Sequence, residues 1–452
     1  DLLRDIVRSY RQLPVVLYHF QTKFRDEPRA RGGLIRVREF VMKDSYSCDR
    51  DMDGLDDSYR KHYAAYERIF ERLGLETIAV ASDVGMMGGL QAHEFMVLNP
   101  HGEDVLVLCE GCGFAANRQV ARVEVRERDN GDPLPIEKIA TPGAATIEDL
   151  SAFLKIDRAV TAKATFFVDG DGRLITAIVR GDRNVNETKL ANAVHAVTLR
   201  SAQAQEIRAA GMEPGFASPI GAHGTLVVID DLIGRSTNLV AGANREGFHY
   251  RNVNVPRDFV PDIVADIITA EEGDGCPDCR GGAVILRNGI EVGNIFKLGT
   301  RYTEALGARY LGEDGELHPV VLGSYGIGIG RALACIVEAH HDDKGIVWPG
   351  EIGPYAAHLV ELRAAKNPDV KELANRLHDA AMDAQREILW DDREESPGVK
   401  LTDAELLGMP KILTLSARSL AAGGVEVTER ATGERRIEPV ESVEAWLRRR
   451  AV

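Results

Sequence analysis

Residues 24–47 read FRDEPRARGGLIRVREFVMKDSYS, and this pattern predicts two antiparallel strands joined by a polar turn. The first strand is expected to end within residues 24–27. Residues 28–33 cannot continue it, because they contain a proline and two adjacent glycines. Residues 34–43 alternate between apolar and polar side chains, which predicts the second strand of the hairpin.

The two faces of this hairpin differ in chemistry, because successive side chains of a strand point to opposite faces. The apolar face suits a protein core and carries Ile35, Val37 and Val41. The other face combines guanidinium groups, a carboxylate and an aromatic ring, on Arg25, Glu27, Arg36, Arg38 and Phe40. These groups suit the phosphates, the amine and the ring of a nucleotide. A solvated hairpin with surface ion pairs is the alternative that the residues alone leave open.

This stretch resembles motif 2 of the class II aminoacyl-tRNA synthetases, and in particular that of the bacterial-type prolyl-tRNA synthetases. The resemblance continues along essentially the whole chain. It implies that Arg25 holds the α-phosphate of ATP and the aminoacyl carboxylate, and that Glu27 lies at the adenine amine. It also implies that Arg36 contacts the outer phosphates and that Phe40 stacks on adenine. The implied fold is of the α/β (α+β) class, with an antiparallel-sheet catalytic domain, an inserted editing domain and an anticodon-binding domain.

The composition is that of a globular protein with several domains. At 452 residues the chain is too long for one core, and about three domains are expected. Hydrophobic residues make up 44% and charged residues 28%, and no apolar run approaches the roughly 20 residues of a membrane span. Six cysteines are too few for a disulfide framework, which favours a reducing cytoplasm. The net charge of −15 argues only weakly against a nucleic-acid partner, because a local basic surface is sufficient.

The chain begins at Asp1, inside a predicted amphipathic helix. The family that it resembles has a preceding segment with motif 1, which builds the dimer interface, and a Thr-x-Glu loop that binds the imino group of proline. We therefore expect a chain that lacks the N-terminal segment of the family, and a homodimer in the full-length protein.

Residues 1–119 are expected to form the first part of the catalytic domain. Residues 56–74 place aromatic and aliphatic side chains at helical spacing, which predicts a helix that packs on the core. The glycine-rich residues 85–89 and the following His93-Glu94-Phe95 resemble the turn and strand beside the amino-acid pocket. The resemblance implies that His93 binds the substrate, although a single histidine is more often structural.

Residues 120–275 are expected to form a separate α/β module, with strands at 165–168, 174–179 and 225–229 and a helix at 185–197. The module resembles the insertion domain that hydrolyses alanine mischarged on tRNA(Pro). The matching residues are Lys163, Asp230 and His249, with a loop from Gly215 to Pro219 at the lip of the pocket. Lysine, aspartate and histidine could orient an ester and a water, but each alone is more often a surface group.

Residues 276–350 are expected to complete the catalytic domain. The alternating strand at 289–299 carries Glu291 as a substrate-binding residue, and Asn294 where the family often has histidine. Residues 323–331, GSYGIGIGR, form a glycine-rich turn from strand to helix and resemble motif 3. The resemblance implies that Arg331 holds the γ-phosphate of ATP. Ser324 stands beside the proline pocket, where many relatives have cysteine.

Residues 351–452 resemble the anticodon-binding domain of class II synthetases. Strands are expected at 357–362 and 412–415, and helices at 370–389 and 443–449. The whole chain therefore suggests proline activation with ATP and Mg²⁺, transfer to tRNA(Pro), and editing. Two alternatives are a non-catalytic paralogue that binds tRNA and a fragment that only deacylates mischarged tRNA.

Two C-x₂-C pairs flank the inserted module, namely Cys109 with Cys112 and Cys276 with Cys279. A long gap between such pairs usually weakens a zinc prediction. An inserted module, however, leaves and re-enters its host domain through neighbouring segments, which would bring the four thiolates together. We therefore expect a structural Zn²⁺ site with tetrahedral geometry. The alternative is four reduced thiols that line an ordinary hinge.

Overall fold

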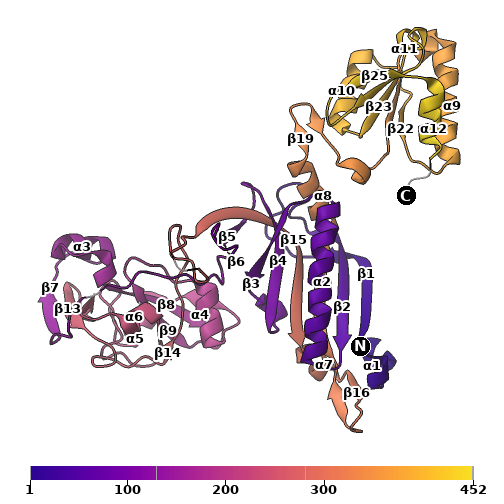
Figure 1. Cartoon of the computed structure of the whole chain (residues 1–452). Helices are drawn as coiled ribbons and strands as arrows, with labels where there is room; N and C mark the ends of the chain where they lie inside the picture. The colour runs from indigo at the N-terminus through magenta and orange to yellow at the C-terminus, as the bar shows by residue number, and fades with distance from the viewer. Residues whose placement is uncertain (1, 129, 280, 450–452) are drawn as a thin grey trace. The chain divides into compact units, whose positions relative to one another are not determined.

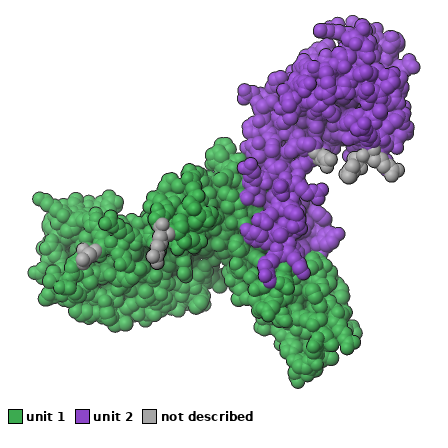
Figure 2. All heavy atoms as spheres, in the orientation of Figure 1, with its two compact units in different colours: residues 1–17, 46–59, 78–325 green, residues 18–45, 60–77, 326–452 purple. Residues whose placement is uncertain are grey.

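The computed structural model describes residues 2–128, 130–279 and 281–449 (Figure 1). The chain divides into two compact units (Figure 2). Unit 1 comprises residues 1–17, 46–59 and 78–325, and unit 2 comprises residues 18–45, 60–77 and 326–452. No helix within the described residues is long and apolar enough to cross a membrane.

The largest sheet has eight strands, in the order β1-β2-β18-β15-β4-β3-β6-β5. Its strands are β1 (Val15–Phe24), β2 (Glu39–Asp49), β3 (Thr77–Ser82), β4 (Gln91–Leu98), β5 (Asp104–Leu108), β6 (Ala115–Asn117), β15 (Ile285–Gly299) and β18 (Val321–Gly328). The long strand β15 pairs antiparallel with both β4 and β5. The mainly antiparallel sheet confirms the fold class that the sequence predicts for the catalytic domain.

Helix α2 (Met52–Arg72) covers the predicted helix except its last two residues, and Tyr59, Tyr66 and Phe70 are buried as expected. Other helices within residues 1–340 include α1 (Leu2–Ile6), α7 (Arg301–Leu306) and α8 (Ile329–Ala339). A core cluster in unit 1 joins residues from distant segments: Val7, Leu13, Cys48, Ala92, Phe296, Leu298, Tyr310, Val320 and Leu322. Apolar residues of β4 and β15 therefore pack into this core.

The hairpin of residues 24–47 differs from its prediction. Strand β1 ends at Phe24, and β2 begins only at Glu39. Between them the backbone N–H groups of Arg31 and Arg36 each donate to the other residue's carbonyl, at 2.9 and 3.2 Å. Gly32 and Gly33 adopt positive φ angles of 67° and 59°, which reverse the chain. The prediction of a strand from residue 34 is therefore wrong for the residues before Glu39, because the glycine pair sets the local backbone.

The inserted module contains a five-stranded sheet, β10-β8-β9-β11-β14, and a three-stranded sheet, β12-β13-β7. The strands are β7 (Glu137–Ala140), β8 (Ala162–Asp169), β9 (Leu174–Arg180), β10 (Leu199–Ser201), β11 (Thr225–Ile229), β12 (Leu239–Gly242), β13 (Phe248–Val253) and β14 (Ile263–Val264). The helices are α3 (Ile147–Leu154), α4 (Glu187–Val194), α5 (Ala204–Ala209) and α6 (Asp231–Arg235). The three predicted strands are confirmed.

Helix α4 is shorter than the predicted helix at 185–197, for a local reason at each end. Asn186 caps its start, because the Asn186 side chain accepts a hydrogen bond from the N–H of Lys189. His195 ends the helix with a φ of 56°, in the left-handed region.

The C-terminal part of unit 2 is a mixed α/β fold around the sheet β22-β21-β23-β24-β25. Its elements are β21 (His358–Glu361), α9 (Pro368–Asp383), β22 (Leu389–Asp391), α10 (Pro397–Leu407), β23 (Lys411–Leu415), α11 (Ala417–Ala421), β24 (Val425–Glu429), β25 (Arg435–Glu438) and α12 (Val440–Leu447). Helices α9 and α12 pack together over the core of this domain (Figure 1). Helix α9 ends before the predicted residue 389, because Gln385 adopts a φ of 58°.

Candidate functional site

The loop between β1 and β2 brings four of the predicted nucleotide-binding residues together in unit 2. The guanidinium of Arg36 forms an ion pair with the carboxylate of Glu27, at 2.8 Å. The guanidinium carbon of Arg25 lies 5.0 Å from the ring centroid of Phe40. A third arginine ties the loop together, since Nε of Arg38 donates to the carbonyl of Glu27 at 2.9 Å. The loop and the start of β2 therefore carry cationic, anionic and aromatic groups, although β2 begins later than the predicted strand.

Arg331 lies in the first turn of α8, directly after β18. Its Nε donates a hydrogen bond to the backbone carbonyl of Ile35 at 2.9 Å. Gly330, its neighbour, also lies near the loop: a Cβ at this position would meet Cβ of Leu34 at 3.9 Å. The predicted motif 3 arginine is therefore in contact with the loop that carries motif 2.

In unit 1 the structure places His93 against helix α2. Its Nδ1 lies 2.7 Å from the hydroxyl of Tyr59, and the ring centroids of the two residues are 5.9 Å apart. Burial lowers the pKa of His93, and the positive charge of Lys297 lowers it further. His93 is thus a neutral side chain on the helix-covered face of β4. Its role in substrate binding stays a prediction.

Glu94 points to the opposite face of the sheet from His93, because successive strand residues alternate. Across the β4–β15 pairing it faces Asn294, and its Oε2 accepts a hydrogen bond from Nδ2 of Asn117 at 3.1 Å. Burial, together with the nearby charge of Glu291, raises the pKa of Glu94 to about 8. Sequence reasoning did not select Glu94. The sequence signal that could have identified it is a carboxylate within a strand of mainly apolar residues.

The predicted substrate residues Glu291 and Ser324 lie on β15 and β18. Nδ2 of Asn294 donates to Oε1 of Glu291 at 2.7 Å, so the asparagine at the family's usual histidine position orients this carboxylate. Ser324 is buried at 8% exposure. The next residue, Tyr325, lies 2.9 Å from Oγ of Ser47 through its hydroxyl. Polar groups are thus inserted into the centre of the sheet.

The inserted module contains a cavity of about 270 Å³ that brings Lys163, Gly215 and His249 together. Small residues make up much of its wall, namely Ala145, Ala162, Ala164, Gly181, Ala217 and Gly242. His249 is 5% exposed, and burial lowers its pKa to about 4. Burial also lowers the pKa of Lys163, whose Nζ donates to Oδ1 of Asn184 at 2.9 Å. The cavity therefore offers a neutral imidazole and an amine beside a small space.

The other two predicted editing residues lie elsewhere. Asp230 is 1% exposed and caps α6, where its Oδ1 accepts from the N–H of Leu232 at 3.0 Å. Its Oδ2 accepts from the N–H of Ile267, also at 3.0 Å. Pro219 lies at the end of the lip loop, and its carbonyl accepts from the N–H of Ala222 at 3.1 Å. In this structure the carboxylate of Asp230 caps α6, and the carbonyl of Pro219 closes a local turn.

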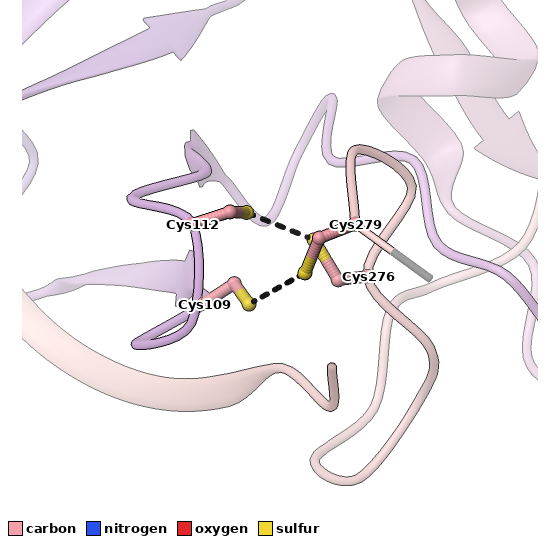
Figure 3. A group of neighbouring side chains, drawn as sticks. All are labelled: Cys109, Cys112, Cys276 and Cys279. Atoms are coloured by element: carbon pink, nitrogen blue, oxygen red, sulfur yellow. Dashed lines mark hydrogen bonds between the residues drawn. The ribbon is translucent and has the colours of Figure 1, made fainter. Parts of the chain in front are cut away.

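Four cysteines form a cluster at the neck of the inserted module (Figure 3). Their sulfur atoms all lie within 4.8 Å of one another. The shortest pairs join the two chain segments: Cys109 with Cys279 at 3.6 Å and Cys112 with Cys276 at 3.5 Å. Gly282 packs against them, since a Cβ there would lie 2.6 Å from Sγ of Cys279. The predicted convergence of the two C-x₂-C pairs is confirmed.

Comparisons with known proteins agree with this geometry. Residues 1–340 match the tRNA synthetase class II core domain (G, H, P, S and T), and residues 355–450 match the anticodon binding domain. The proline–tRNA ligase of Salinispora tropica is 50% identical, over 99% of this chain and 76% of its own length. The corresponding ligase of Dehalococcoides mccartyi is 46% identical, over 98% of this chain and 77% of its own length.

A solved structure supports the fold. The crystal structure of prolyl-tRNA synthetase from Cryptosporidium parvum, complexed with L-proline and AMP, matches with a TM-score of 0.51 and 12% sequence identity. The match covers 98% of this chain and 55% of the other. Sheet, motif loop and C-terminal domain are those of a class II aminoacyl-tRNA synthetase. Within that class, the chain belongs to the prolyl-tRNA synthetases, which are proline–tRNA ligases.

Proposed function

We propose that the β1–β2 loop and Arg331 form the ATP site of this proline–tRNA ligase. The observation that carries the proposal is the hydrogen bond from Arg331 to the carbonyl of Ile35. In the proposed site Arg25 holds the α-phosphate and the aminoacyl carboxylate, and Arg331 holds the γ-phosphate. Phe40 stacks on adenine, Glu27 accepts from its amine, and the Arg36 guanidinium meets the outer phosphates.

The proposed first step is in-line attack of the proline carboxylate on the α-phosphate, which forms prolyl-adenylate and releases pyrophosphate. This step needs positioned groups and neutralised charge more than a protein base. Arg25 and Arg331, with Mg²⁺ on the phosphates, supply the positive charge. Transfer of the prolyl group to tRNA(Pro) releases AMP. His93, Glu291 and Ser324 are proposed to contribute to the proline site.

Proline-dependent exchange of pyrophosphate into ATP tests this proposal. We expect exchange in the presence of Mg²⁺, and prolyl-tRNA(Pro) when the tRNA is added. A chain that binds tRNA(Pro) but exchanges no pyrophosphate would favour the non-catalytic alternative. The match of residues 355–450 to the anticodon binding domain supports a tRNA contact in this part of the chain.

We also propose that the cavity around Lys163 and His249 edits alanyl-tRNA(Pro). A neutral histidine can accept a proton from a water that attacks the ester, and the lysine amine can hold the substrate. The supporting observation is that both side chains line one cavity with small residues. Release of alanine from alanyl-tRNA(Pro) by the chain is the expected result. If the wild-type chain leaves this ester intact, the module has no editing function.

The cysteine cluster is proposed to hold one structural Zn²⁺. With Zn–S bonds near 2.3 Å, tetrahedral geometry separates the sulfur atoms by about 3.8 Å. The two shortest sulfur distances, 3.5 and 3.6 Å, fit that geometry with small adjustment. Elemental analysis of freshly purified protein should find one zinc per chain. Protein without zinc, under conditions where added zinc also fails to bind, would contradict the proposal.

The proposed domain division is 1–119 and 276–350 for the catalytic domain, 120–275 for the editing module and 351–452 for the anticodon-binding domain.

Homodimerisation is proposed from the exposed aromatic side chains of β1: Tyr18 is 71%, Phe20 64% and Phe24 75% exposed. Light scattering should report twice the monomer mass for the dimer. The six cysteines form no disulfide, which suits the reducing cytoplasm that is the proposed location.

A further inference from the structure

The lip of the editing cavity is a loop of residues 215–220. Asn244, which lies outside this loop, forms hydrogen bonds to it. Gly215 and Ala217 from this loop line the same cavity as Lys163. The ring centroid of Phe216 lies 5.5 Å from that of His249. The position of this loop therefore sets both the width of the cavity and the surroundings of the imidazole.

Asn244, in the turn between β12 and β13, forms four hydrogen bonds to the lip. Its backbone N–H donates to the carbonyl of Phe216 at 2.8 Å. Its Oδ1 accepts from the N–H of Ser218 at 2.8 Å. Its Nδ2 donates to the carbonyls of Ser218 and Ile220, at 3.0 and 2.8 Å. One amide side chain thus satisfies three backbone groups of the loop, next to a Ser218 that is only 1% exposed.

The backbone around Asn244 is shaped for this contact. Asn244 adopts a φ of 52°, a left-handed conformation that asparagine tolerates better than most residues. At Gly242, the last residue of β12, a Cβ would lie 2.2 Å from the carbonyl carbon of Phe216. The lip therefore lies directly on the β12–β13 hairpin. Because β13 also carries His249, the cavity wall and the imidazole belong to one connected element.

We propose that Asn244 is a positioning residue that fixes the lip and so limits the editing cavity to small aminoacyl esters. This inference rests on the editing function proposed above. Without the amide, Ser218 and Ile220 lose their partners, and the loop must move to pair these backbone groups with water. A wider cavity of this kind would accept the bulkier prolyl ester and would hold the alanyl ester less precisely against His249.

The test compares Asn244→Gly with the wild-type chain on alanyl-tRNA(Pro) and prolyl-tRNA(Pro). Glycine keeps the positive φ but removes the amide. We expect the ratio of kcat/KM for the alanyl ester to that for the prolyl ester to fall by roughly tenfold or more. The conservative Asn244→Asp, which keeps the acceptor for the N–H of Ser218 but loses the donor, should give an intermediate ratio.

Asn252→Gly is the matched control. Asn252 also has a positive φ, of 57°, and lies on β13, which follows the turn of Asn244, but its side chain donates to the carbonyl of Pro135 at 2.9 Å. Its variant should keep the wild-type ratio, and pyrophosphate exchange should confirm that all preparations are folded. Wild-type editing with an unchanged ratio in both Asn244 variants overturns this inference alone. A wild-type chain that releases no alanine overturns the editing function, and this inference with it.

Discussion

Arg331 and Ile35 are 296 residues apart in the sequence, yet Nε of Arg331 donates a hydrogen bond to the carbonyl of Ile35 at 2.9 Å. The contact joins the first turn of α8 to the loop that carries Arg25, Glu27 and Arg36. A guanidinium has five N–H donors. The hydrogen bond through Nε therefore ties the first turn of α8 to the loop.

Arg331→Ala should reduce proline-dependent pyrophosphate exchange. Loss of one well-placed charged donor costs about 2–4 kcal/mol of transition-state stabilisation. Arg418→Ala, which removes an exposed arginine from α11, is the control and should leave exchange unchanged. Exchange by Arg331→Ala within a factor of three of the wild-type rate would contradict the proposed phosphate contact.

Phe40→Ala should raise the KM for ATP, because the stacking surface for adenine is lost. Stacking of a base on an aromatic ring contributes about 1–3 kcal/mol. Val41→Ala is a close control, since Val41 is the next residue of β2, points to the other face and is 42% exposed. The KM for ATP from exchange kinetics is the measurement. Equal KM values for the two variants would exclude Phe40 from the adenine site.

His249 should make the chain less stable at acidic pH. Its pKa is lowered to about 4 in the folded state by burial, whereas an unperturbed histidine has a pKa near 6.5. Between these values the unfolded chain binds more protons, so stability decreases as the pH falls from 6.5 to 4. From pH 7 to pH 5 the loss should be about 2 kcal/mol. His249→Gln should show a smaller decrease of the unfolding temperature over this range; an equal decrease would contradict the buried neutral imidazole.

Glu94, in contrast to His249, should make the chain less stable as the pH rises. Its pKa is raised to about 8 by burial and by Glu291, so the folded chain keeps a proton that the unfolded chain releases near pH 4.5. Stability should therefore fall as the pH rises from 4.5 to 8 and level off above that range. Glu94→Gln should remove this decrease, whereas Glu76→Gln, at an exposed carboxylate, should keep it. Thermal unfolding of the three proteins at several pH values is the measurement.

Gly282→Ala should weaken zinc binding at the cysteine cluster. The added Cβ would lie 2.6 Å from Sγ of Cys279 and 3.1 Å from Sγ of Cys109, so both ligands must move. Gly111→Ala is the matched control, because its Cβ would lie 3.8 and 3.9 Å from the same two sulfur atoms, at ordinary contact distance. Competition with a chelating dye should show affinity reduced by roughly 10- to 100-fold in Gly282→Ala only. Identical affinities would argue against a metal at this position.

Local patterns predicted much of the fold. The strands at 165–168, 174–179 and 225–229 lie within β8, β9 and β11, because short apolar runs between turn residues have few other structures available. The convergence of Cys109 and Cys112 with Cys276 and Cys279 followed from topology, since an inserted module enters and leaves at neighbouring points. The hairpin after Phe24 was predicted less well, because the positive φ angles of Gly32 and Gly33 shorten the second strand.

The sequence predicted which residue types the candidate site contains, but not which way their side chains point. Alternation along β4 shows that His93 and Glu94 point to opposite faces, but not which face meets α2. The contact of Tyr59 with His93 settles this, and it depends on where a helix 34 residues earlier packs. Asp230 was grouped with Lys163 and His249 by resemblance, whereas its two backbone hydrogen bonds place it as a cap of α6.

The sequence by itself determined the class of the protein, its order of modules and the chemistry available in each, because motif residues and hydrophobic periodicity are properties of short segments. Tertiary structure alone decided which of those groups meet. Arg331 reaches Ile35, Asn244 holds the lip loop, and burial sets the protonation of Glu94 and His249. Each of these depends on packing between segments distant in the chain, where desolvation and hydrogen-bond geometry are fixed only once the whole domain has folded.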